Sequence, residues 1–160
     1  MAAWKVRRSA GEVASADAEF VIEASLGYLM NRAARAMAQQ LAEALRPAGV
    51  GIGQWAVLMF LWADDGLTQA ELSRIVAIEP PTMVRTIDRM ARDGLVERRR
   101  DAGDGRLSRI YLTGRGRKLR DELVPRAVAV NERNIGRLGK QADMFVGLLK
   151  NLLQGDGSSG

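Results

Sequence analysis

Residues 68–116 place the strongest constraint on the fold, because they hold a fixed order of short structural patterns. Two short helical patterns come first, separated by a turn. Two alternating strand patterns follow, joined by a polar segment that contains glycine. Two short helices followed by a hairpin predict a helix-turn-helix with a β-wing. We therefore expect a mainly α fold with a small β-wing.

A capping box opens the first short helix. The Thr68 hydroxyl can accept a hydrogen bond from the Glu71 amide while the Glu71 carboxylate reaches back to Thr68. The apolar spacing that follows predicts a helix that buries Leu72 and Ile75.

The second short helix has a start signal and a stop signal. Glu79 occupies an N-cap position and Pro80 the first helical position, where a missing N–H costs nothing. Gly94 ends the helix. Its apolar side holds Met83, Ile87 and Met90, and its other side shows Pro81, Thr82, Arg85, Arg89 and Arg92.

The predicted wing has two strands and a polar tip. Residues 95–98 form the first strand and residues 108–113 the return strand, with Ile110 and Leu112 facing inward. Residues 99–107 form the tip, where two glycines supply turn freedom. Thr113 is expected to cap the helix that follows.

The positive charge is concentrated in the middle third of the chain. Residues 67–120 carry thirteen basic and seven acidic side chains, a net charge of +6. Residues 1–66 carry six basic and seven acidic side chains, and residues 121–160 carry five of each. An arginine-rich block between two nearly neutral ones is typical of a polyanion-binding module. A generally basic protein remains the alternative on charge alone.

Residue types that carry much of enzyme chemistry are missing. The chain has no cysteine and no histidine, so it lacks thiolate nucleophiles, the commonest general base and the commonest metal ligand. Its carboxylates show no paired set at a recognisable spacing. We therefore expect no enzymatic activity, no metal site and no cofactor.

Long apolar helical patterns flank the winged unit. The first covers residues 17–46 with Asp17 as N-cap, and spans about 40 Å at 1.5 Å a residue. A second runs from Gly114 into the 130s, and a last one covers residues 141–153. The last helix is expected to bury Phe145, Leu148, Leu149 and Leu152. Because the first helix is longer than a small domain needs, we expect part of it to pack on a partner.

The segment at residues 54–63 is apolar almost all round, which predicts a central helix buried on every side. No run approaches the roughly 18–20 uncharged apolar residues of a membrane span, and no signal peptide is visible. A soluble cytoplasmic protein is expected. Its predicted parts are a flexible arm (1–16), a helical dimerisation region (17–50 and 117–153), a winged helix-turn-helix (51–116) and a flexible tail (154–160).

Several short motifs occur in a fixed order along the chain. They are Gln54-Trp55 with Val57-Leu58, Leu67-Thr68-Gln69-Ala70-Glu71-Leu72, Thr82 with Arg85, Asp88-Arg89, Gly94-Leu95-Val96-Glu97-Arg98, Asp104-Gly105-Arg106 and Leu112-Thr113-x-x-Gly116. None is specific by itself. As an ordered set they resemble the MarR family, the multiple antibiotic resistance regulators.

The resemblance implies a dimeric winged helix-turn-helix transcription factor, usually a repressor of nearby genes. It implies that the first and last helices form the dimer interface. It also implies a small phenolic or anionic effector, bound between the dimer and DNA-binding lobes in many members. Repressor and activator remain undecided, as do the operator and the effector.

Side chains at the start of the recognition helix are candidates for contact with DNA bases. Such helices enter the major groove with their N-terminal turns. Arg85 can bond a guanine through two N–H groups, with a phosphate contact or a solvated position as alternatives. Pro81 can make only apolar contact, next to Thr82. Arg89 is better explained by a phosphate contact or by pairing with an acid.

The wing carries a second group of candidates. By resemblance, Arg106 inserts into the minor groove and Asp104 orients a neighbouring arginine through a bidentate bond. Gly105 stands where the family often has arginine. Phosphate contacts are expected from Arg98, Arg99 and Arg100, with a solvated charged face as the alternative.

An aromatic and methionine stripe on the central helix marks, by resemblance, the place of an effector pocket. Core packing is the alternative interpretation. The candidates are Tyr28, Met30, Arg35, Trp55, Met59 and Trp62, with Arg32 as another source of positive charge.

The sequence therefore predicts a homodimer that binds double-stranded DNA at a pseudo-palindromic operator, with half-sites about 10 bp apart. Its function would be that of a transcriptional repressor released by a small aromatic or anionic effector. The alternative is a winged-helix module that binds protein without sequence-specific DNA binding.

Overall fold

A computed structural model describes residues 22–101 and 103–154. The flexible N-terminal segment predicted at residues 1–16, the Asp17 cap and residues 155–160 of the predicted tail lie outside these ranges. The elements are α1 (Leu26–Leu45), α2 (Ile52–Ala63), β1 (Leu67–Thr68), α3 (Gln69–Val76), α4 (Pro80–Arg92), β2 (Val96–Arg100), β3 (Ser108–Leu112), α5 (Gly114–Leu138) and α6 (Ala142–Gln154). The predicted fold class, mainly helical with a small β-wing, is confirmed.

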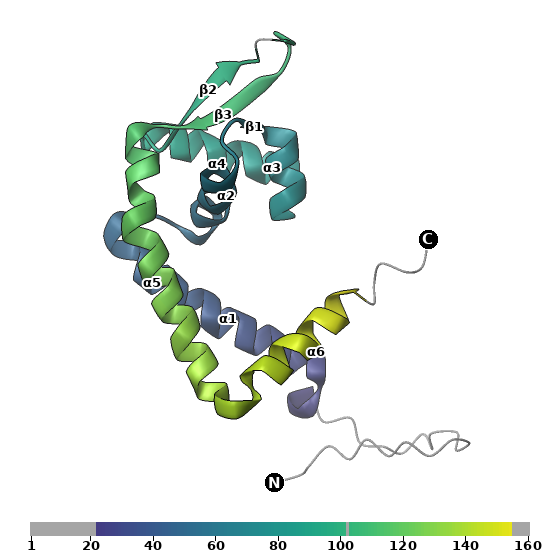
Figure 1. Ribbon diagram of the computed structural model, residues 1–160. Helices are drawn as coiled ribbons and strands as arrows, with labels where there is room; N and C mark the ends of the chain where they lie inside the picture. Colours follow the sequence, from purple (N-terminus) through teal and green to yellow (C-terminus); the bar gives the residue numbers. More distant parts are fainter. Residues whose placement is uncertain (1–21, 102, 155–160) are drawn as a thin grey trace, which may run out of the picture.

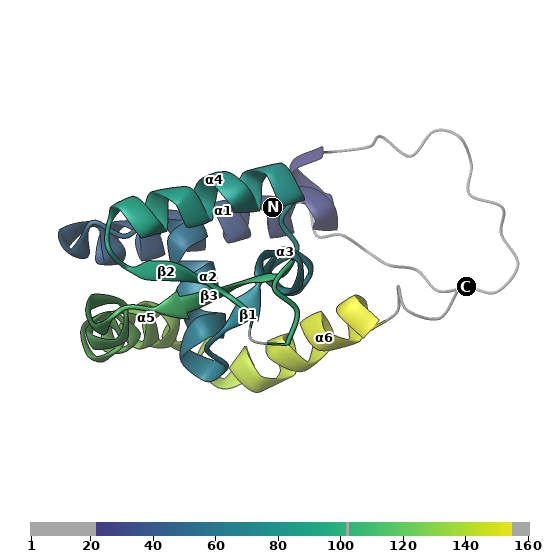
Figure 2. The same ribbon diagram turned by 90° about the horizontal axis from the view of Figure 1, so that it is seen from above.

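The described part has a lobe and an arm (Figure 1). The lobe contains α2, α3, α4 and the sheet, whose hairpin projects from it. The arm contains α1 and α5, which lie side by side, and α6, which turns back at the far end of α5. Figure 2, seen from above, places α4 and α5 on opposite sides of the hairpin. Within the described ranges, no single helix is long and apolar enough to cross a membrane; α1 and α2 meet that test only as a pair bent by 78°.

The hydrophobic core lies in the lobe and extends to the nearest turns of α1 and α5. Apolar side chains from every element except α6 meet there. The fully buried ones include Leu45, Val57, Leu58, Leu61, Leu72, Met83, Ile87, Met90, Leu95, Ile110 and Leu123. A core shared by α2, α3, α4 and the sheet fixes the position of the winged unit as one body.

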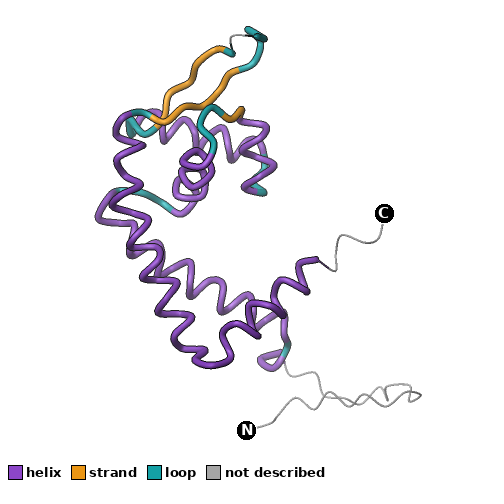
Figure 3. The backbone as a smooth tube through the Cα atoms, viewed as in Figure 1, coloured by secondary structure: helices purple, strands orange, loops and turns teal. Residues whose placement is uncertain are grey.

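The sheet is antiparallel in the order β1-β3-β2, and its strands are the orange segments of Figure 3. In the hairpin, Val96 pairs with Leu112 and Arg99 with Arg109. The two-residue strand β1 was not predicted. The first wing strand extends two residues beyond the prediction, so Arg99 and Arg100 lie on β2 rather than in the tip. As predicted, Ile110 and Leu112 on β3 are buried.

The first long helix starts later than predicted. Ile22–Ala24 form a short 3-10 turn, and α1 begins at Leu26. Ser25 is the N-cap: its backbone is extended, with ψ 132°, and its hydroxyl accepts from the Tyr28 amide at 3.4 Å. The helix has 20 residues, about 30 Å instead of 40 Å. The apolar spacing upstream of Ser25 belongs to the 3-10 turn and misled the prediction.

The central helix α2 is not buried on every side. Val57, Leu58 and Leu61 point into the core, whereas Met59 and Phe60 are 43% and 37% exposed. The helix contacts α1, α3, α4, α5 and β3. One side of α2 nevertheless stays uncovered by the described residues.

The last helix also contradicts the predicted burial. Phe145, Leu148 and Leu152 are 43%, 55% and 49% exposed, and Leu149 is half-buried. Within this helix Ala142 alone is buried, because α6 touches the end of α5 and little else. Most of its apolar side chains are therefore left exposed by the described residues.

Candidate nucleic-acid interface

The capping box fixes the start of α3 as predicted. The Thr68 hydroxyl accepts from the Glu71 amide at 3.2 Å, and the Thr68 amide donates to Glu71 Oε2 at 2.7 Å. The amide and hydroxyl of Thr68 lower the pKa of the Glu71 carboxyl, because both bonds favour its charged form. Leu72 is buried, but Ile75 is 42% exposed, so its predicted burial is wrong. Val76 packs against the core beside Leu72 instead, and the Ser73 side chain is also buried.

The turn between α3 and α4 is held by backbone geometry and by the Ser73 hydroxyl. Ala77 adopts a left-handed conformation at φ 55° and ψ 45°, which ends α3. The Ser73 hydroxyl donates to the carbonyl of Ile78, and the Ile78 amide donates back to the carbonyl of Ser73 at 3.0 Å. Glu79 and Pro80 then begin α4 at the predicted positions. Because the buried polar groups of the turn are satisfied, the direction of α4 is well defined.

The recognition helix α4 presents a mixed apolar and cationic surface. Its inner side consists of Met83, Ile87 and Met90, each at most 1% exposed, as predicted. Val84 joins the exposed side at 45%. The spacing of three residues from Pro81 is the signal that places it there. The other exposed residues of α4 are Pro80, Pro81, Thr82, Arg85, Asp88, Arg89 and Arg92.

The candidate arginines divide into paired and unpaired groups. Arg98 pairs with Asp88 at 2.6 Å. Arg99 pairs with Glu97 and lies 4.9 Å from the centre of the Tyr111 ring. Such exposed pairs contribute about 0–1 kcal/mol, so a phosphate can compete for either arginine. Among the described residues, no ion pair engages the side chains of Arg85, Arg89, Arg100 or Arg106.

The wing tip differs from the arrangement expected for Asp104. Its carboxylate accepts the backbone amide of Arg106 at 2.9 Å, and it forms no ion pair with an arginine among the described residues. The carboxylate that holds an arginine is Asp101, which pairs with Arg109 on β3. That guanidinium, followed by the amides of Asp104 and Gly103, lowers the pKa of Asp101 to about 2. Sequence reasoning missed this pair; the eight-residue spacing of Asp101 and Arg109 across a hairpin was the available signal.

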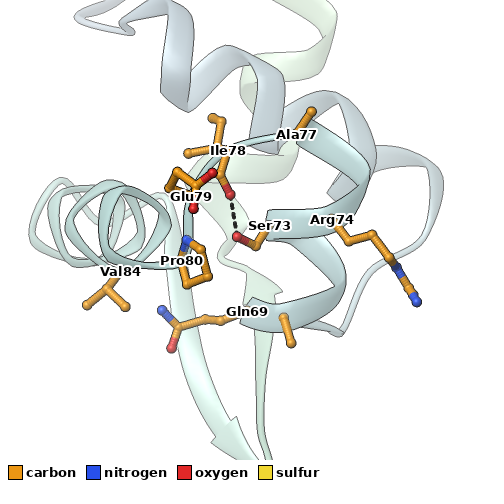
Figure 4. Close-up of a pocket in the computed structure, with 9 residues that line it drawn as sticks. Gln69, Ser73, Arg74, Ala77, Ile78, Glu79, Pro80 and Val84 are labelled. Atoms are coloured by element: carbon orange, nitrogen blue, oxygen red, sulfur yellow. Dashed lines mark hydrogen bonds between the residues drawn. The ribbon is translucent and has the colours of Figure 1, made fainter. Parts of the chain in front are cut away.

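A surface pocket of about 590 Å³ lies where α3 meets α4. Figure 4 shows Gln69 and Ser73 on α3 facing Pro80 and Val84 on α4, with the Ser73–Ile78 hydrogen bond at its edge. The amide nitrogen of Gln69 is buried and has no partner within the described residues. The recognition surface is therefore bordered by a hollow on the side of α3.

The predicted effector residues are only partly brought together. Trp55 and Trp62 form an edge-to-face pair with ring centres 5.7 Å apart. Trp62 also donates from Nε1 to the carbonyl of Gly116 at 3.0 Å, which ties α2 to α5. Met59 is exposed on the same helix. The remaining candidates, Tyr28, Met30 and Arg35, lie in the first half of α1, whereas the residue of α1 that is buried in the core is Leu45 at its other end.

The described ranges contain no group of three or more side chains that could hold a metal ion.

The winged unit is joined to the arm by hydrogen bonds and an ion pair. Asp65 accepts the Leu112 amide at 2.8 Å and pairs with Arg117 at 2.7 Å. The Thr113 hydroxyl caps α5, as predicted, through the Gly116 amide at 3.0 Å. The lobe and the first turns of α5 thus share several hydrogen bonds.

Comparison with known proteins establishes the family. The model of the MarR family matches residues 48–107, from the end of α1 into the wing. The HTH-type transcriptional repressor Rv2887 of Mycobacterium tuberculosis is 34% identical over 107 residues, which are 66% of this chain and 77% of that protein. The chain belongs to the MarR family. MarR proteins named in these comparisons are transcriptional regulators rather than enzymes.

Solved MarR structures share the fold. A MarR regulator from Methanosarcina mazei has a TM-score of 0.73 and 27% identity, covering 81% of this chain and 94% of that one. CouR from Rhodococcus jostii, bound to p-coumaroyl-CoA, has a TM-score of 0.75 and 25% identity, covering 88% and 96%. Rv2887 in complex with salicylic acid has a TM-score of 0.65 and 30% identity, covering 81% and 96%.

Proposed function

We propose that this MarR protein is a homodimeric, sequence-specific repressor that binds double-stranded DNA in the cytoplasm and is released by a small-molecule effector. One observation carries the proposal. The exposed side of α4 and the tip of the wing present arginines without ion-pair partners among the described residues, and both lie in the part of the chain with a net charge of +6. Phosphates and base edges are the natural partners of such a surface.

The two elements support two kinds of DNA contact. In the major groove, Arg85 would bond guanine, while Pro81 and Val84 would contact a thymine methyl group. In the minor groove, Arg106 would enter a narrow A·T-rich tract. Arg98 and Arg99 would exchange their exposed acidic partners for phosphates. The mixed surface therefore favours a site with guanine and thymine in each half and A·T pairs beneath the wing.

The uncovered apolar side chains of the arm support a homodimer. On α1, Leu26 and Leu29 are 61% and 50% exposed; on α6, Leu148 and Leu153 are 55% and 79% exposed. Exposed apolar patches of this extent mark interaction sites. A second copy of the chain would cover them and would place two recognition helices about one helical turn of DNA apart.

The effector part of the proposal rests on aromatic side chains near the junction of lobe and arm. Trp55 and Trp62 form an aromatic pair where α2 meets α5. The relatives Rv2887 and CouR carry salicylic acid and p-coumaroyl-CoA in their structures. Both ligands combine an aromatic ring with negative charge, which supports a small aromatic anion as effector. Rv2887 is named a transcriptional repressor, which supports the proposal that this chain also represses transcription.

Selection of duplexes from a random pool tests the DNA-binding proposal. The wild-type chain is expected to enrich an inverted repeat with half-site centres about 10 bp apart. Enrichment of no common sequence, or of a single unrepeated site, would contradict a sequence-specific dimer. The protein-binding alternative predicts no enrichment at all.

Size-exclusion chromatography with light scattering tests the dimer. Leu148→Glu is expected to give monomers at micromolar concentration, because a charge would be buried without a partner in the dimer. The control Lys150→Glu lies on the opposite side of α6 and should leave the dimer intact. A wild type that elutes as a monomer at micromolar concentration would exclude the dimer.

A further inference from the structure

The Asp101 carboxylate closes the tip of the wing. Its Oδ1 accepts the backbone amides of Gly103 and Asp104, each at 2.8 Å. Its Oδ2 accepts Nε of Arg109 on β3. The Asp101 amide donates to the carbonyl of Leu107 at 3.0 Å. A single residue at the end of β2 thus organises the turn and holds the return strand.

Arg109 continues this chain of contacts from the wing to the lobe. Its Nη1 donates to the carbonyl of Gly66, in the turn between α2 and β1, at 2.9 Å. The Gly66 amide donates to the carbonyl of Ile110 at 3.1 Å. Gly66 has φ 92°, and a Cβ there would lie 2.6 Å from the Tyr111 ring. The guanidinium is therefore anchored to a tightly packed part of the backbone.

The other hydrogen bonds of the tip are local: Asp104 accepts the Arg106 amide with its carboxylate and the Leu107 amide with its carbonyl, each at 2.9 Å. Neither bond reaches the lobe. The Arg98–Asp88 pair fixes β2 to α4 and does not reach the turn. A Cβ on Gly105 would meet nothing within 4 Å, so the tip next to Arg106 is loosely packed. Glycines in an open turn lose much conformational freedom on ordering. The direction in which Arg106 projects consequently depends on the Asp101 turn.

We propose that Asp101 and Arg109 are positioning residues for DNA binding, which set the angle of the wing so that Arg106 meets the minor groove. The proposal rests on the DNA-binding function proposed above. As a pair, the two side chains add no net charge, so their contribution is geometric.

Charge and position predict opposite effects when the carboxylate is removed. Asp101→Asn deletes one negative charge beside DNA, so electrostatics alone predicts tighter binding. A positioning role predicts weaker binding, because the neutral amide loses the charge-assisted bond to Arg109. The sign of the change therefore separates the two explanations.

The test uses the full chain and a duplex that the wild type has selected from a random pool, with binding followed by fluorescence anisotropy. Asp101→Asn is expected to weaken binding roughly tenfold, within the range of coupled neighbouring residues. Arg106→Ala should weaken the wild type strongly but the Asp101→Asn variant much less, because Arg106 is already misplaced there. Arg109→Lys should weaken binding as much as Asp101→Asn does. A lysine ammonium group lacks the planar geometry with which the guanidinium bonds both the Asp101 carboxylate and the Gly66 carbonyl.

Glu79→Gln is the charge control. It also removes one negative charge next to the proposed DNA-binding surface, but the exposed Glu79 side chain makes no cap hydrogen bond to α4, so binding as tight as wild type or tighter is expected. A second readout is base preference: exchanging A·T for G·C pairs beneath the wing should weaken the wild type and have little effect on Asp101→Asn. Thermal melts check that each variant is folded at the assay temperature. If Asp101→Asn is unfolded at that temperature, Arg109→Lys tests the same prediction.

Two results would overturn the inference alone: Asp101→Asn binding as tightly as the wild type, or Arg106→Ala causing the same loss in both backgrounds. A wild type without salt-dependent affinity for any duplex would overturn the proposed function and this inference with it.

Discussion

Replacing Gly116 with alanine tests how the winged unit is joined to the arm. Gly116 lies in the first turn of α5, and its carbonyl accepts the indole N–H of Trp62. A Cβ there would lie 2.1 Å from the carbonyl oxygen of Leu95 and 3.1 Å from Leu112 Cδ2. Carbon and oxygen normally approach to about 3.3 Å, so the Leu95 backbone or the helix has to move by about 1 Å.

The energetic cost follows from the contacts that this movement disturbs. Overpacking costs about 1–3 kcal/mol. The Leu95 carbonyl also accepts the Thr113 amide at 3.0 Å, and losing that bond adds about 1 kcal/mol. Alanine is more favourable than glycine inside a helix by about 0.5–1 kcal/mol, which offsets part of this cost. The expected net loss is about 1–3.5 kcal/mol with a central value of about 2 kcal/mol, which for a chain of this size lowers Tm by about 4–8 °C.

Urea denaturation followed by circular dichroism measures this loss, at one fixed protein concentration because dimerisation shifts the midpoint. Gly114→Ala is the matched control, two residues earlier in the same turn, where a Cβ would meet nothing within 4 Å. It should stay within about 1 kcal/mol of wild type. Equal midpoints for the two variants would show that the close approach at Gly116 can relax without cost, and would refute the reasoning.

Three further changes have defined outcomes. Ala77→Gly should stabilise the fold by about 0.5–1 kcal/mol in urea titrations, because glycine relieves the left-handed strain at φ 55° and offsets its higher entropy in the unfolded chain; lower stability would contradict this. Arg85→Ala should weaken binding to the selected duplex by about 1–3 kcal/mol and relax the preference at one base pair, whereas Arg92→Ala should leave that preference unchanged. Asp101 has a pKa of about 2 in the fold and 3.8 as its ordinary value, so it contributes stability above about pH 3.8 that is lost as the pH falls towards 2. Asp101→Asn should remove this part of the acid dependence, and identical acid titrations for variant and wild type would contradict it.

Features fixed by nearby residues were predicted well from the sequence. The Thr68–Glu71 capping box spans three positions, and the buried seam of α4 follows a helical period within one element. The hairpin and its inward Ile110 followed from alternation and glycine placement. In each case the interacting groups lie close in sequence, so local chemistry determines the structure.

Features that depend on distant partners were missed or misplaced. Arg109 reaches Gly66 across 43 positions, and no local pattern indicates that contact. On α3, Leu72 and Val76 meet the core and Ile75 is left exposed; the apolar spacing alone does not decide between Ile75 and Val76. The predicted burial of Leu148 in α6 failed within one chain, because periodicity indicates an apolar side but not which molecule covers it. Likewise, the aromatic stripe on α2 indicated that Trp55 and Trp62 lie on the same side of the helix, but it did not indicate where Tyr28 of α1 lies.

The salt dependence of duplex binding tests the central claim most directly. The wild type is titrated with its selected duplex and with a scrambled duplex between 50 and 300 mM salt. We expect log K for both to fall steeply with log salt, with about 0.9 of slope for each phosphate contacted. The selected duplex should bind tighter throughout, and Arg100→Ala, which removes one expected phosphate contact, should flatten the slope by about one contact. A flat slope, or equal affinity for the two duplexes, would contradict the account of this protein as a sequence-specific DNA-binding regulator.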